Sequence, residues 1–126
     1  MEVVPIKIVI GGQIDKQEIA ALINNIGGDK VTVTVMGDIQ AAMEVKNGQA
    51  DYYIGACNTG GGGALSMAIA LIGHSFCSTL SMPSKIMSND EIAAEVAAGK
   101  KAFGMTSQHI NTVVPVLMEN LLKKAE

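Results

Sequence analysis

The sequence predicts an α/β protein, a Rossmann-like three-layer α/β/α sandwich around a five-stranded, mostly parallel sheet. Short runs rich in β-branched residues alternate with helical patterns five times along the chain, which is typical of a parallel sheet with crossover helices. Hydrophobic residues make up 48% of the 126 residues, a high share that suits a sheet covered on both faces. Neither a linker nor an internal repeat interrupts this pattern, so we expect residues 1–126 to form a single α/β domain.

The first half of the chain predicts three strands and two helices. Residues 6–10 (IKIVI) and 51–56 (DYYIGA) are apolar enough for buried strands, whereas 31–36 (VTVTVM) alternates in polarity and is expected near a sheet edge. Asp15 and Glu18 have the spacing of a capping box and predict the start of the first helix. A second helix is expected over residues 39–46, before Asn47-Gly48.

The second half predicts two more strands and three helices. Residues 76–81 and 101–105 are expected to be strands, and 63–72 a helix that is apolar nearly all round. Ser88 and Glu91 form a second capping-box pattern, opening a helix through Ala97. Thr106 is expected to cap a last helix to about residue 123, with a kink or a restart at Pro115.

The glycine-rich segment Cys57-Asn-Thr-Gly-Gly-Gly-Gly63 is the strongest functional signal in the sequence. It follows the third predicted strand and opens a helix, where exposed N–H groups and the helix dipole favour anions. In parallel sheets, ligands bind at the carboxyl ends of the strands, near the point where strand order reverses. The alternative is a tightly packed turn that binds nothing. The residues expected to bind a ligand are Gly11, Gly12, Asn58, Thr59, Gly60, Gly61, Gly62, Gly63, Ser66 and Thr106.

Cys57 is the candidate catalytic residue. Donors at a helix N-terminus lower a thiol pKa and favour the thiolate, which could act as a base or a nucleophile. The alternative is a small buried hydrophobic residue, which is also expected for Cys77. His109, close to the same edge, could contact an anion or lie in solvent.

Composition excludes several classes of function. The net charge is −3, and all nine basic residues are lysines, so the footprint of a nucleic-acid-binding protein is missing. Two cysteines provide neither a disulfide framework nor zinc-ligand spacing. Neither the dinucleotide fingerprint nor a P-loop is present, so no cofactor and no metal are expected. The sequence shows neither a signal peptide nor a stretch long enough to span a membrane, and we expect a cytoplasmic protein.

Two resemblances centre on the same loop. Residues 51–60 (DYYIGACNTG), 41–43, 64–66 and Ala102-Phe103-Gly104 resemble a small uncharacterised glycine-rich bacterial family, the YhfU-like proteins, over nearly the whole chain. More distantly, residues 54–60 and 102–104 resemble ribose-5-phosphate isomerase B. That resemblance implies a Rossmann-like fold, a dimer, and a proton-transferring cysteine at Cys57. The chain has Gly12-Gln13-Ile14 where that family carries an Asp-His pair, and it has no arginine to hold phosphate.

Together these features predict a protein that binds a small anionic, sugar-phosphate-like metabolite at the loop, with isomerase-type proton transfer as a possible activity. We also expect a homodimer, because the apolar helix over residues 63–72 has more hydrophobic surface than one sheet face can cover. The alternative is a non-enzymatic subunit or regulatory module that docks a partner protein through this helix.

Overall fold

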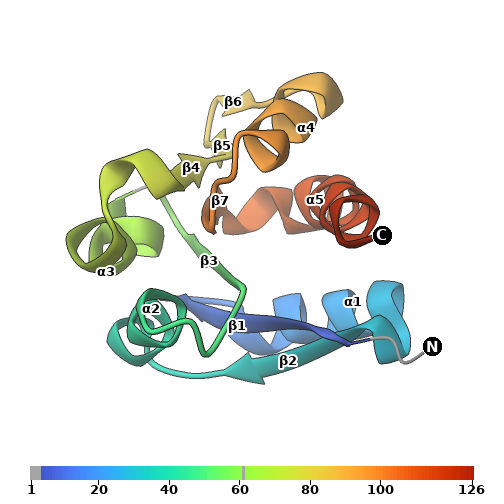
Figure 1. The fold of residues 1–126 in the computed structure, drawn as a ribbon. Coiled ribbons are helices and arrows are strands. Elements are labelled where there is room, and N and C mark those ends of the chain that lie inside the picture. Colours follow the sequence, from blue (N-terminus) through green and yellow to red (C-terminus); the bar gives the residue numbers. More distant parts are fainter. Residues whose placement is uncertain (1–3, 61) are drawn as a thin grey trace.

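A computed structural model describes residues 4–60 and 62–126 and has the predicted three-layer architecture (Figure 1). Five parallel strands form the central sheet in the order β2-β1-β3-β7-β4. The five strands are β1 (Ile6–Gly12), β2 (Val31–Val35), β3 (Tyr52–Cys57), β4 (Cys77–Thr79) and β7 (Ala102–Thr106). The α-helices are α1 (Lys16–Gly27), α2 (Asp38–Lys46), α3 (Gly62–Ile72), α4 (Asn89–Ala97) and α5 (Ile110–Ala125), with 3-10 turns at Gly28–Lys30, His74–Phe76 and Ser107–His109.

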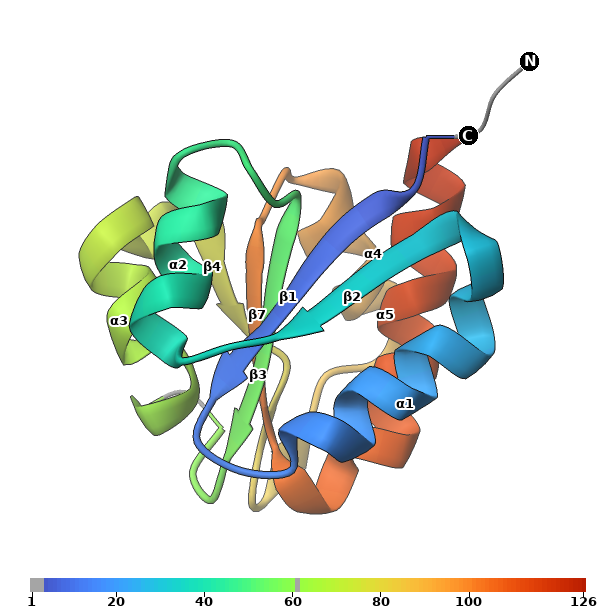
Figure 2. The ribbon, with the colours of Figure 1, turned by 90° about the horizontal axis from the view of Figure 1, so that it is seen from below.

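Two helix layers cover the two faces of this sheet (Figure 2). Helices α2 and α3 lie on one face, and α1, α4 and α5 lie on the other. The larger hydrophobic cluster joins the sheet to α1, α4 and α5, and the smaller one joins it to α2 and α3. Because both faces are covered, the inner strands β1, β3 and β7 are buried almost throughout.

The strand order reverses beside β1. The chain passes from β1 through α1 to β2 at the sheet edge, and then through α2 back across β1 to β3. The carboxyl ends of β1 and β3 therefore flank the topological switch point, where α/β sheets bind ligands. Strand β2 lies at the edge of the sheet, as its alternating polarity predicted.

The fourth predicted strand, over residues 76–81, is wrong in its extent. The sheet strand β4 covers only Cys77–Thr79, and the chain then forms a small antiparallel hairpin from β5 (Ser81–Met82) and β6 (Lys85–Ile86). Strand β4 is also the edge strand, since β7 lies between it and β3. A short edge strand pairs on one side only, so fewer ladder hydrogen bonds extend it.

Two of the three predicted helix caps differ in the structure. Asp15 adopts a left-handed conformation, with φ of 56°, and its side chain makes no capping hydrogen bond. Thr106 also makes no capping hydrogen bond, because its hydroxyl turns to the carbonyl of Ser81. The capping box of Ser88 and Glu91 is confirmed in both directions. Pro115 lies inside α5, which runs without a restart.

Candidate functional site

Cys57 ends β3 at the switch point and is buried, with 2% of its surface exposed. Its sulfur accepts a hydrogen bond from the backbone N–H of Gly60 at 3.1 Å. The Thr59 hydroxyl lies 3.4 Å from the same sulfur. The loop therefore folds back so that its own donors converge on the Cys57 sulfur.

This convergence changes the acidity of the thiol. Burial by itself raises the pKa of Cys57, but hydrogen bonds from the Thr59 hydroxyl and backbone N–H outweigh it. The N–H groups of Gly60 and Ala64, the latter in the first turn of α3, act in the same direction. The net result is a pKa below the ordinary value of a thiol, and hence a larger thiolate fraction near neutral pH.

The other thiol has the opposite environment. Cys77 begins β4, is buried and packs in the α2–α3 hydrophobic cluster. Burial raises the pKa of Cys77, with a smaller opposing effect from the ammonium group of Lys100. Cys77 is therefore the core residue that the sequence predicted, and of the two thiols only Cys57 is activated.

The loop conformation depends on a close approach at Gly60. This residue has φ of +92°, and a Cβ there would collide with the backbone carbonyl of Ser81 in the β5–β6 hairpin. On its other side the carbonyl of Gly60 lies over Gly104 of β7, at 2.7 Å from where a Cβ of Gly104 would be. A side chain at either position would push the loop off the sheet and remove the N–H of Gly60 from the Cys57 sulfur.

Tyr53 supports the same site through two hydrogen bonds of its hydroxyl group. Its hydroxyl accepts a hydrogen bond from the N–H of Gly12 at 2.8 Å and donates one to the carbonyl of Ala64 at 2.6 Å. The ring also occupies the space in which a side chain of Gly11 would lie. Burial raises the pKa of Tyr53 well above its ordinary value, so that the phenol stays protonated and can donate. Tyr53 thus joins the end of β1 to the start of α3.

The sequence-predicted ligand residues differ in how far they are exposed. Gly11 and Gly12 are buried against Tyr53 and Ala56, and Thr106 is buried with its N–H donating to the Ser81 hydroxyl. Asn58, Thr59, Gly62 and Ser66 are exposed along the loop and the first turns of α3, Gly63 is half-buried there, and Gly60 is buried. Gly61 lies outside the described residues. The structure thus places the exposed candidates in one segment, Asn58 to Ser66.

Sequence reasoning gave no role here to Tyr53, Ser81 or Gln13, although it placed Gln13 at the same ends of the strands. The amide group of Gln13 lies over the α-carbon of Gly63, with its Nε2 2.8 Å from where a Cβ of Gly63 would be. Ser81 was hidden within the overlong fourth strand. Tyr53 could have been suspected, because a buried tyrosine in the strand that leads into the glycine-rich loop needs a hydrogen-bond partner for its hydroxyl.

His109 lies in the 3-10 turn that follows the carboxyl end of β7 and precedes α5. Its Nδ1 is buried without a hydrogen-bond partner among the described residues, and its Nε2 lies 3.2 Å from the amide nitrogen of Gln108. Within residues 4–60 and 62–126, three or more His, Cys, Asp or Glu side chains do not come together as metal ligands. In the same ranges, every helix is too short or too polar to cross a membrane.

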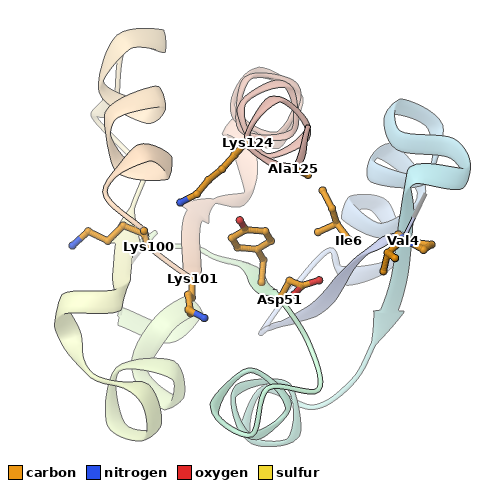
Figure 3. A pocket seen from close by; sticks show the side chains of 10 residues that line it. Val4, Ile6, Asp51, Lys100, Lys101, Lys124 and Ala125 are labelled. Carbon is orange, nitrogen blue, oxygen red and sulfur yellow. The ribbon is translucent and has the colours of Figure 1, made fainter. Parts of the chain in front are cut away.

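A separate pocket of about 420 Å³ lies at the amino ends of the parallel strands, where β1, β3 and β7 begin (Figure 3). Its polar side chains are Asp51, Tyr52, Lys100, Lys101 and Lys124. The sequence alone does not predict this pocket, because its residues come from four distant parts of the chain.

Comparison with known proteins gives relatives and a fold but no activity. The chain is 47% identical over 89 residues to the uncharacterized protein YhfU of Escherichia coli K12, covering 71% of this chain and 76% of that protein. The same values hold for the YhfU protein of Shigella flexneri. The type B ribose 5-phosphate isomerase of Trypanosoma cruzi has a similar structure, with a TM-score of 0.64 and 12% identity over 94% of this chain and 84% of that one. This likeness confirms the Rossmann-like fold.

One family model matches most of the chain. It covers residues 6–121, from the first residue of β1 into the last two turns of α5. The match includes β3, the Cys57 loop and α3. The chain therefore belongs to the family described as protein of unknown function DUF2620.

Proposed function

We propose that the loop from Cys57 to Gly63 binds a small anionic metabolite of the sugar-phosphate type and that Cys57 acts there as a proton-transfer base. The observation that carries this proposal is the 3.1 Å hydrogen bond from the Gly60 N–H to the Cys57 sulfur. A thiolate held by backbone donors keeps its charge without a basic partner, because these hydrogen bonds lower the pKa of Cys57 below the ordinary value of a thiol.

The chemistry would be that of an aldose–ketose isomerisation. The Cys57 thiolate removes the proton on the carbon beside the substrate carbonyl, which leaves an enediolate and a neutral thiol. The thiol then gives a proton to the former carbonyl carbon, and the hydroxyl proton on the adjacent oxygen moves to the former carbonyl oxygen. Atoms and charge then balance, and no cofactor is needed. Asn58 and Thr59 directly follow Cys57 in the chain, and their side chains are exposed. They are the candidates to stabilise the enediolate oxygen.

The solved neighbour supports the substrate class only by analogy of fold. The Trypanosoma cruzi protein is named as an isomerase of ribose 5-phosphate. In the present chain, without any arginine, the phosphate would be held by N–H groups at the start of α3. A thiol base and a helix N-terminus within one loop would serve the reacting carbon and the phosphate of such a substrate.

The binding part is tested by a thermal-shift panel of pentose phosphates, hexose phosphates and inorganic phosphate. We expect at least one sugar phosphate to raise the melting temperature, and Thr59→Val to reduce this shift. The matched control is Thr112→Val, an exposed threonine on α5. A panel without any shift, or an equal shift in the Thr59 variant, contradicts the proposed binding.

The catalytic part is tested separately by solvent deuterium exchange into the ligand that the panel identifies. We expect exchange to be lost in Cys57→Ser and kept in Cys77→Ser, since only Cys57 has donors directed at its sulfur. Exchange that survives in Cys57→Ser would leave a binding site without the proposed base.

We also propose that a second copy of the chain covers the α2–α3 face. Helix α3 (GGALSMAIALI) carries no charged side chain, and Ile39, Met43 and Phe76 are exposed by 59%, 36% and 45%. A groove of about 260 Å³ lies between the ends of α2 and α3, with Val45, Leu71 and Ile72 in its walls. Apolar surface of this kind marks an interface more often than a free surface.

The same face supports the alternative function, docking of a partner protein. Sedimentation of the purified chain decides between them, because a homodimer should form from this chain alone. We expect a dimer that Ile39→Asp with Phe76→Asp converts to a folded monomer. A wild-type monomer at high concentration favours the partner-docking function instead.

A further inference from the structure

The pocket at the amino ends of the strands has the features of a second ligand site, independent of the Cys57 loop. It lies where β1, β3 and β7 begin, and its volume is about 420 Å³. Tyr52 lines this pocket at the amino end of β3, whereas Cys57 lies at the carboxyl end of the same strand. A molecule bound here would therefore not contact the glycine-rich loop.

Lys124 provides a fixed positive charge. It reaches in from α5 (Figure 3). Its ammonium group donates a hydrogen bond to the carbonyl of Val96 at 3.0 Å. Val96 belongs to the last turn of α4, which contains no basic residue of its own, so the ammonium group also complements that helix end. One of its three protons is used in this bond, and two remain to bind a ligand.

Asp51 provides a fixed negative charge at the start of β3. Its Oδ2 accepts a hydrogen bond from the backbone N–H of Lys7 at 2.8 Å, which anchors the carboxylate beside β1. In Figure 3, Asp51 and Lys124 approach the pocket from different elements, whereas Lys100 is turned away. Lys100 is also engaged elsewhere, since its ammonium group donates to the carbonyl of Ser75 at 2.8 Å.

Tyr52 adds a polar group between apolar walls. Its ring is half-buried against Phe103, with the ring centres 6.1 Å apart, and its hydroxyl makes no hydrogen bond to residues 4–60 or 62–126. Burial, and then the charge of Asp51, raises the pKa of Tyr52, so the phenol keeps its proton and can donate. Ile6, Pro5 and Ala125 form the apolar part of the wall.

From this arrangement we propose that the pocket binds a small zwitterion, an amino acid or a similar amino-alkyl anion. Its anionic end would pair with Lys124 and the Tyr52 hydroxyl, and its ammonium end with Asp51. A simple anion would offer the Asp51 carboxylate no opposite charge, and a simple cation would offer none to the Lys124 ammonium group. Charge-assisted hydrogen bonds at both ends favour the molecule that carries both charges.

The probes for this proposal are glycine, β-alanine, γ-aminobutyrate and δ-aminovalerate, which place the two charges at increasing separation. Propionate and propylamine carry one charge each and serve as matched ligands. Binding is followed by nuclear magnetic resonance, through the backbone amide signals of Asp51, Tyr52 and Lys101. We expect one amino acid to shift these signals saturably and to bind at least about tenfold more tightly than either single-charge ligand.

Variants then assign the contacts. Asp51→Asn, Lys124→Met and Lys124→Gln should each weaken the best ligand at least about tenfold. Lys124→Gln keeps a donor for the Val96 carbonyl, so it separates loss of charge from loss of packing. Lys85→Met removes the same charge on the β5–β6 hairpin, and Cys57→Ser alters the other edge, so both should bind as the wild type does.

Three results would overturn the proposal. The first is that none of the four amino acids shifts the signals saturably. The second is that propionate binds as tightly as the best amino acid, which makes the pocket a plain anion site. The third is unchanged affinity in a folded Lys124→Gln variant. These three results do not depend on whether the Cys57 loop binds a sugar phosphate. The loop is at the other ends of the strands and is tested separately with the Thr59→Val and Cys57→Ser variants.

Discussion

The hydroxyl of Tyr53 donates a hydrogen bond to the carbonyl of Ala64 at 2.6 Å and thereby ties the third strand to the first turn of α3. The same hydroxyl accepts from the N–H of Gly12 at the end of β1. One phenol oxygen therefore joins the carboxyl end of β1 to the helix that follows the Cys57 loop. The position of the thiol relative to α3 depends on this bridge.

Removing the bridge should destabilise the protein. Tyr53→Phe leaves the N–H of Gly12 and the carbonyl of Ala64 buried without their partner, which we expect to cost about 2–3 kcal/mol of unfolding free energy. Urea denaturation measures this change. The control is Tyr52→Phe, whose hydroxyl borders a pocket and bonds to no described residue, so its loss should stay within about 0.5 kcal/mol. Equal effects of the two changes would show that the Tyr53 bridge is not a structural support.

The loop should tolerate no side chain at Gly60. Gly60→Ala combines a φ of +92° with a collision against the Ser81 carbonyl, which cannot move without the hairpin. We expect it to cost at least about 2 kcal/mol in unfolding free energy. Gly48→Ala is the matched control, because Gly48 has φ of +77° but open space around it, and it should cost about 1 kcal/mol. Similar losses at both positions would mean that backbone strain alone, and not the contact with Ser81, fixes Gly60.

The two thiols should titrate in different pH ranges. The ultraviolet absorbance of the thiolate in Cys77→Ser reports Cys57, and we expect its midpoint below that of an unstructured thiol. The midpoint in Cys57→Ser, which reports Cys77, should lie above it. Thr59→Val should raise the midpoint of Cys57, because it removes the side-chain hydrogen bond to the sulfur. A Cys57 midpoint at or above that of Cys77 would contradict the activated thiolate.

The lowered pKa of Cys57 also has a consequence for stability. Because the folded-state pKa lies below the unfolded one, ionisation of Cys57 stabilises the folded chain fully above the unfolded-state pKa. This contribution is lost as pH falls through the folded-state pKa. The difference in unfolding free energy between the wild type and Cys57→Ser should therefore grow as pH rises through this window.

The residues Ser88 and Asp15, at the starts of α4 and α1, should contribute differently to the unfolding free energy. Ser88→Ala removes the hydrogen bond from the N–H of Glu91 to the Ser88 hydroxyl at 3.1 Å and should cost about 1 kcal/mol. Asp15→Asn should change the unfolding free energy by less than about 0.5 kcal/mol, because Asp15 makes no capping bond and asparagine also tolerates its left-handed conformation. A large loss at Asp15 would show that its charge stabilises α1 without a direct bond.

Much of the fold could be predicted because the relevant signals are local. Apolar runs such as residues 6–10 and 52–56 form strands that are buried on both faces, and the hydrogen bonds of Ser88 and Glu91 span only three residues. The glycine-rich segment was correctly placed at the end of β3 and the start of α3. Such features depend on periodicity and on neighbouring residues, which the chain itself supplies.

The remaining features depend on contacts between distant segments. Residues 76–81 have strand-like composition, but β4 pairs only with β7 and ends at Thr79, after which Ser81 joins a hairpin. The Thr106 hydroxyl turns from a capping role to the carbonyl of Ser81, 25 residues away. No local pattern distinguishes these outcomes, because the competing partner is brought in only by the fold.

By itself, the sequence determined that this protein is a parallel α/β sandwich with a thiol and a glycine-rich turn at the carboxyl end of its third strand. Only the tertiary structure decided how the turn is used. It placed Ser81 and Gly104 against Gly60, and thereby directed the Gly60 N–H at the Cys57 sulfur. It also brought Asp51 and Lys124 to one pocket at the opposite edge of the sheet. The reason is physical: strand and helix periodicity are set by near neighbours, whereas donor direction and charge grouping are set by packing between elements that lie far apart in the chain.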